Sequence, residues 1–151
     1  MLVWSVQNTI VRDRLLEGHV HRVPWLQVGA ADRKPFEAMA DAMRAAGTEF
    51  ETAPIWAWRG EGSNAAMAEV CQMLLSERDR EADLVILRLQ VPAGLAHLSS
   101  YSRWQDFYLG GDGVQTWSEM AEADDDASQV TLPHLEPSWL VESLPVPPPL
   151  Y

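Results

Sequence analysis

The feature that most constrains the fold is the segment LVILRLQV at residues 84–91, where only Arg88 and Gln90 interrupt an apolar run. A short run of this kind, followed by turn-forming residues, is typical of a strand covered on both faces. We therefore predict that it forms the central strand of a sheet. The segment PIWAW at 54–58 has a period of two and predicts a second strand of the same sheet. Its two tryptophans, Trp56 and Trp58, then lie on one side of that sheet.

The clearest helical pattern covers residues 34–47. Apolar side chains recur there at i, i+3, i+4 and i+7 and form one face, made of Phe36, Met39, Ala40 and Met43. We expect Pro35 in the first turn, where its missing N–H is not needed, and the helix end at Gly47. A second helix is predicted at 8–18, capped by Asn8 or Thr9 and closed by Gly18.

A third helix is expected after a cap at Ser63, with an apolar face of Met67, Val70, Cys71, Leu74 and Leu75. Further short elements are predicted as strands at 2–6, 19–23, 96–100, 129–132 and 138–144, a helix at 101–109, a charged connection at 77–83 and a loop at 122–128. Helices and strands alternate irregularly, which favours the α+β class. We predict a single compact domain at 1–144, with a mixed, mainly antiparallel sheet packed by three to four helices, and a Pro-rich tail at 145–151.

The cysteine count and the hydropathy indicate the cellular compartment to expect for the chain. A single cysteine, Cys71, excludes an intrachain disulfide and favours a reducing, cytoplasmic setting. No apolar run approaches the roughly 20 residues that span a bilayer, and the N-terminal segment has no signal-peptide pattern. We therefore expect no membrane partner.

Charge is placed unevenly along the chain. Residues 1–103 carry thirteen acids and eleven basic residues, whereas residues 104–151 carry nine acids and no lysine or arginine. Nucleic-acid binders usually show a basic stripe, so this pattern argues against a nucleic-acid partner. The acidic last third is either a solvated surface or a patch that meets a basic protein surface.

Several segments resemble an uncharacterised bacterial domain family of unknown function. LVWSVQNTIVRDRLLEG is similar to its Trp-x-x-Gln opening, PFEAMADAM to its second helix and PIWAW to its most specific motif. LRLQVPAGLAHLSSYSRWQDFYL and SQVTLPHLEPSWLVES resemble two later stretches. The resemblance implies a compact α+β domain and no known activity. The chain lacks the family's Lys-Pro-Asp-Leu-Arg segment and has His134 where the family usually has a glutamate, which puts the family's site in doubt.

Candidate ligand-binding residues are those whose side chains stack flat rings or offer specific hydrogen bonds. They are Gln7, Trp56, Trp58, Arg59, Ser99, Trp104, Gln129 and His134. Each also has a structural interpretation: core packing for the tryptophans, a strand-end bond for Gln7, a surface position for Arg59 and a helix cap for Ser99. Glu119 and Glu136 would be the nearest carboxylates for acid–base chemistry.

Other site classes find little support. His19 and His21 share a strand face, but no third ligand sits at metal-binding spacing. There is no nucleophile-elbow, phosphate-loop or calcium-loop motif. No catalytic residue or metal is therefore assigned.

Three functions stay open. The first is a small-ligand or nucleotide-binding domain, for which fold analogy alone suggests a degenerate relative of ADP-ribosyltransferase-like folds and NAD as a cofactor candidate. Alternatively, the chain is an acidic protein-binding module without catalytic activity, or a purely structural domain. We favour the first, and expect one cleft lined by the eight candidates.

Overall fold

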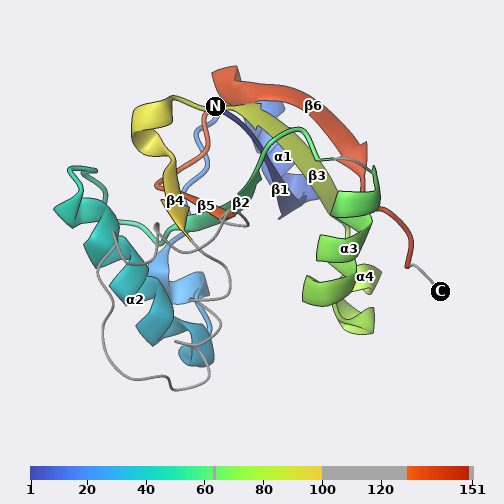
Figure 1. Cartoon of the computed structure of the whole chain (residues 1–151), viewed down its shortest axis with the longest axis horizontal. Coiled ribbons are helices and arrows are strands. Elements are labelled where there is room, and N and C mark those ends of the chain that lie inside the picture. The colour runs from blue at the N-terminus through green and yellow to red at the C-terminus, as the bar shows by residue number, and fades with distance from the viewer. Residues whose placement is uncertain (63, 100–128, 150–151) are drawn as a thin grey trace. The chain divides into compact units, whose positions relative to one another are not determined.

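The computed structural model describes residues 1–62, 64–99 and 129–149. Its strands are β1 (Leu2–Asn8), β2 (Ile55–Arg59), β3 (Leu84–Gln90), β4 (His97–Ser99), β5 (Gln129–Leu132) and β6 (Leu140–Pro145). They hydrogen-bond in the order β4-β5-β2-β1-β3-β6 (Figure 1). Four helices accompany them: α1 (Thr9–Leu16), α2 (Ala30–Ala45), α3 (Asn64–Leu74) and α4 (Glu77–Glu81). The predicted α+β class with a mainly antiparallel sheet is confirmed.

The chain folds as two compact units. Unit 1 comprises Met1–His21, Ala57–Val91 and Leu135–Tyr151, and unit 2 comprises Arg22–Trp56 and Pro92–His134. Strand β2 contributes its first two residues to unit 2 and the rest to unit 1. The two units are described separately below.

Strand β3 is the centre of unit 1, as its apolar run predicts. It pairs antiparallel with β1 on one side and with β6 on the other. Ile86 on β3 has no exposed surface. Trp4 of β1 lies opposite Trp58 of β2, and the two rings stack with centroids 6.2 Å apart. The central position of β3 and the strand at 54–58 are therefore both confirmed.

A glycine lets the chain pass close to this tryptophan pair. Gly62 has φ +66°, and a Cβ there would lie 2.8 Å from the Met67 Cε and 3.0 Å from the Trp4 indole nitrogen. Neither the backbone conformation nor the available space suits a side chain.

Two helix ends in unit 1 follow capping rules. Helix α1 closes in a Schellman motif, in which Gly18 adopts φ +91° and the amides of Gly18 and His19 bond the Leu15 and Arg14 carbonyls. The prediction of a plain charged connection at 77–83 was wrong. Ser76 and Asp79 form a capping box there, and this reciprocal pair of bonds starts α4.

Helix α2 supplies the core of unit 2. Met39, Ala40 and Met43 are buried with Phe50, and Trp25 and Trp56 pack against them. The helix starts at Ala30, so the expectation that Pro35 lies in the first turn was wrong. The extra turn forms because the chain N-terminal to Pro35 has helix-forming alanines and an acidic residue, Asp32, in its first turn.

The predicted strand at 19–23 does not form. Among the residues that the structure describes, isolated bridges join His21 to Leu135 and Val23 to Ala53. The predicted helix at 101–109 and loop at 122–128 lie outside the described residues, as does the predicted cap Ser63.

Candidate functional site

Strands β4 and β5 of unit 2 carry polar residues on a buried face. His97 lies opposite Thr131, and Ser99 lies opposite Gln129. Because residues two apart share a strand face, the four side chains lie on one face of the pair. His97 is 8 % exposed and the other three have no exposed surface. We call these four residues the polar face.

Burial makes the composition of this face unusual. On the opposite side of β5, Val130 and Leu132 are also fully buried. Strands covered on both sides are normally apolar throughout, because a buried polar group without a hydrogen bond costs about 1–3 kcal/mol. The polar side chains therefore need a reason other than contact with solvent.

Thr48 connects the polar face to helix α2. Its hydroxyl shares a hydrogen bond with the Nε2 atom of His97, and both residues are buried. Thr48 is placed by a Schellman motif, in which Gly47 adopts φ +104° and the Thr48 amide bonds the Met43 carbonyl. The end of α2 thus sets the position of the hydroxyl that holds the imidazole.

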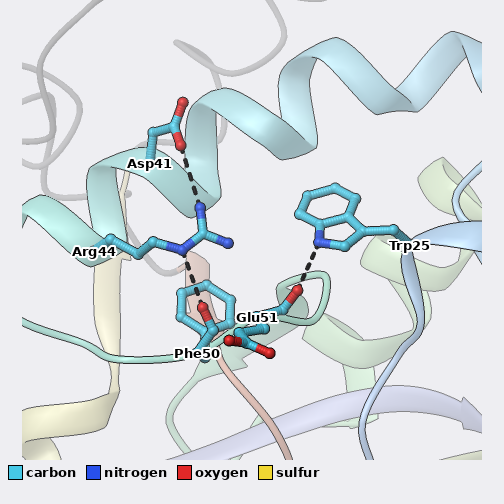
Figure 2. Close-up of polar contacts among 5 residues, drawn as sticks. All are labelled: Trp25, Asp41, Arg44, Phe50 and Glu51. Atoms are coloured by element: carbon cyan, nitrogen blue, oxygen red, sulfur yellow. Dashed lines mark hydrogen bonds and ion pairs between the residues drawn. The ribbon is translucent and has the colours of Figure 1, made fainter.

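The chain after Thr48 is fixed by two side chains (Figure 2). The Arg44 Nε donates to the Phe50 carbonyl at 3.0 Å, and its guanidinium lies 5.0 Å from the centre of the Phe50 ring. Asp41 pairs with the same guanidinium at 3.2 Å. The Trp25 indole donates to the Glu51 carbonyl at 2.9 Å. These contacts hold the segment between α2 and β2 in one conformation.

The polar face is electrically neutral. Burial lowers the pKa of His97 below its ordinary value, because the charged imidazolium loses solvation. The imidazole is therefore uncharged near neutral pH, with one nitrogen as donor and the other as acceptor. None of the four residues, nor Thr48, carries a carboxylate or a thiol. The arrangement offers neutral hydrogen-bonding groups.

The Gln129 amide is the most informative group. Neither its Nε2 nor its Oε1 atom has a hydrogen-bond partner among the described residues, although both are buried. A buried amide of this kind calls for a partner. The amide carries two donor hydrogens and a carbonyl oxygen side by side.

The structure brings two of the predicted site residues together, Ser99 and Gln129, as cross-strand neighbours. Unit 2 also contains half-buried Trp56, whose ring stacks on Phe36 at 6.0 Å, and half-buried His134. Trp104 lies outside the described residues.

The other three predicted residues belong to unit 1. Gln7 donates to the Ser5 hydroxyl at 2.9 Å, a bond between two side chains of β1. Trp58 is 8 % exposed and stacks on Trp4, whereas Arg59 is exposed. The local contacts favour core packing for Trp58. A cleft lined by all eight residues stays a prediction.

Thr48, His97 and Thr131 were missed by sequence reasoning. The segments HLS and QVTL do place polar residues two apart, but such alternation usually marks a face open to solvent. Only burial distinguishes the two cases. Of the predicted carboxylates, Glu119 lies outside the described residues and half-buried Glu136 is in unit 1.

Within the described residues no cluster of His, Cys, Asp and Glu could hold a metal ion. No helix in that part of the chain is long and apolar enough to cross a membrane. Comparison of the chain with protein-family models, curated proteins and solved structures finds no match. The resemblance to the bacterial family therefore stays a prediction.

Proposed function

We propose that unit 2 binds a small neutral ligand that presents a hydrogen-bond donor next to an acceptor. A primary carboxamide or the edge of a nucleobase has this pattern. The observation that supports the proposal is the Gln129 amide, which is fully buried and has no partner among the described residues. A ligand that completes its hydrogen bonds would remove the cost of burying them.

The neighbours of Gln129 narrow the class of ligand. Ser99 and Thr131 add hydroxyls to the same face, and His97 adds an imidazole whose pKa burial lowers. Neutral groups alone give an anion or a cation no compensation for leaving water. We therefore expect uncharged ligands to bind and their charged analogues to be rejected. NAD itself is charged, so it fits this site only through its nicotinamide carboxamide, which is a neutral group.

A matched pair of ligands tests the proposal. Nicotinamide and nicotinate have similar shapes, but one carries a neutral amide and the other a carboxylate. We expect ligand-observed NMR to detect binding of nicotinamide, or of a nucleobase such as adenine or uracil, and no binding of nicotinate. Failure of every neutral probe, or equal binding of nicotinate, would contradict the proposal.

A matched pair of protein variants locates the site. Gln129→Leu removes the amide at nearly constant volume, and we expect it to abolish binding. Gln27→Leu makes the same change at an exposed position and should leave binding intact. Equal binding by both variants would place the ligand elsewhere.

The charge distribution supports a second candidate, an acidic module that binds a basic protein surface. Residues 104–151 contain nine acids and no basic residue. Glu136 and Glu142 are the two described members, and the other seven lie outside the described residues. A complex steered by these charges should weaken above ~0.15 M salt, where the screening length is about 8 Å.

The test of this second candidate is capture of partners from the native cell extract at low and high salt. The control variant replaces Asp124, Asp125 and Asp126 by asparagine. If the amount of captured protein depends neither on salt nor on the asparagine substitutions, the protein-binding module is rejected. The acidic residues would then serve only to keep the surface solvated.

A further inference from the structure

The polar face of unit 2 includes a very short strand. Strand β4 has three residues and lies at one end of the strand order of the sheet. Its ladder with β5 consists of three residue pairs. A strand of this kind opens more readily than a central strand, because few hydrogen bonds must break together. The contacts that β4 makes outside the ladder therefore matter for how firmly the polar face is held.

One such contact joins β4 to the chain that leaves helix α2. The Thr48 hydroxyl and the His97 Nε2 atom share a hydrogen bond between residues 49 positions apart, and both residues are buried. The turn at Gly47 fixes Thr48, and the register of β4 with β5 fixes His97. The bond thus holds together two elements that are remote in the sequence.

This bond depends on the protonation of the imidazole. In the neutral ring one nitrogen donates and the other accepts, so a hydroxyl can bond with either of them. Protonation makes both nitrogens donors and places a positive charge on a buried group. Water solvates an imidazolium far better than a buried site without an opposite charge does. The charged ring therefore favours a state in which β4 has opened and His97 reaches water.

The surroundings of His97 offer little compensation for such a charge. Neither β4 nor β5 contains another acidic or basic residue. After α2, Glu49 is exposed, and within the last turns of that helix Asp41 and Arg44 form an ion pair at 3.2 Å. His134, two residues beyond β5, is half-buried and supplies no negative charge. Within these described segments each acid is thus exposed or paired, and burial is the cause that lowers the pKa of His97.

We propose that Thr48 and His97 form a proton-sensitive latch, which holds the polar face closed at neutral pH and opens it in mild acid. Because Gln129 has no exposed surface, opening of this face gives a ligand a route to its amide. This effect on a ligand rests on the proposed function of unit 2. The latch itself belongs to the ligand-free chain and can be measured without a ligand.

Amide hydrogen exchange of the full chain, followed by NMR from about pH 7.5 to 5 and corrected for the intrinsic exchange rate, measures the opening. Protection of β4 and β5 should fall by up to about tenfold per pH unit below pH ~6.5, because opening takes up one proton. These amides should exchange faster than those of β3 at every pH, since the latch opens without global unfolding. The pH dependence should disappear in His97→Asn and persist in His19→Asn, which changes an exposed histidine.

A second pair of variants tests the hydroxyl. Thr48→Val removes it at nearly constant volume and should speed exchange of β4 at neutral pH by about three- to tenfold. Thr48→Ser keeps the hydroxyl and should change the rate by less than about twofold. Circular dichroism at neutral pH checks that each variant is folded. Equal exchange in the two variants, pH-independent protection of the wild type, or protection of β4 equal to that of β3 would each overturn the latch.

Nicotinamide distinguishes failure of the latch from failure of the proposed function. Its dissociation rate, measured by NMR exchange spectroscopy, should rise by up to about tenfold per pH unit below pH ~6.5 in the wild type and stay constant in His97→Asn. Absence of binding at every pH, together with pH-dependent protection, would contradict the proposed function and support the latch. A dissociation rate that is independent of pH in the wild type would overturn the latch.

Discussion

Replacing Gln129 by leucine should stabilise the free protein and remove its ligand binding. In the structure the side chain is fully buried, and both polar atoms of its amide lack partners among the described residues. Leucine has a similar volume and no polar group. The substitution therefore tests separately whether the fold needs the amide and whether ligand binding needs it.

The expected gain follows from the cost of unsatisfied groups. A buried donor or acceptor without a partner costs about 1–3 kcal/mol. We expect Gln129→Leu to raise the free energy of unfolding by about 2 kcal/mol, or roughly 4–8 °C in Tm for a chain of this size. If the Gln129 amide were hydrogen-bonded, the substitution would instead lower the free energy of unfolding, because it would leave the amide's partners without a hydrogen bond.

Equilibrium unfolding in guanidinium chloride measures this difference, with an unchanged m-value as the check on two-state behaviour. A ligand at 100 times its Kd should add about 2.7 kcal/mol to the wild-type protein and nothing to the variant. Destabilisation of the free variant by more than about 1 kcal/mol would refute the reasoning, since Gln129 would then be hydrogen-bonded without a ligand.

Three further predictions concern stability. Burial lowers the pKa of His97 below its ordinary value of 6.5. Just below pH 6.5 the unfolded chain therefore binds more protons than the folded chain. The free energy of unfolding should then fall as the pH drops through 6.5. His97→Asn should flatten this part of the curve in denaturation series run at several pH values, and an unchanged slope would contradict it. Gly62→Ala should cost about 2–4 kcal/mol in chemical denaturation, because it adds steric overlap to an unfavourable φ. Gly18 has φ +91° and no atom within 4 Å of the new Cβ, so Gly18→Ala should cost only about 1–2 kcal/mol. Equal losses of stability in the two variants would show that steric overlap at Gly62 adds nothing. Glu142→Gln breaks the 2.8 Å ion pair with Arg88, but Glu142 is 45 % exposed, so thermal unfolding should show a loss below about 1 kcal/mol.

The sequence was most informative where local periodicity decides the structure. The run at 84–91 predicted a buried central strand, and the spacing of Met39, Ala40 and Met43 predicted a packed helix. The start of that helix was missed because Pro35 is a strong local signal that the preceding turn overrides. The capping box at Ser76 and Asp79 was also readable, but its helix has five residues and little apolar periodicity.

The site was less predictable because its residues meet through long-range pairing. Ser99 and Gln129 could be chosen as polar candidates, but only the β4–β5 register shows that they are neighbours. His97 was overlooked because a polar residue in a short strand normally faces water. The hydrogen bond between Thr48 and His97 joins residues far apart in the sequence, and no local pattern predicts it.

The pairing of Ser99 with Gln129 also has a consequence for engineering the chain. Opposed residues in an antiparallel pair have their α-carbons about 4.5–5.5 Å apart. A change of side-chain size at one of these two positions is therefore felt directly at the other.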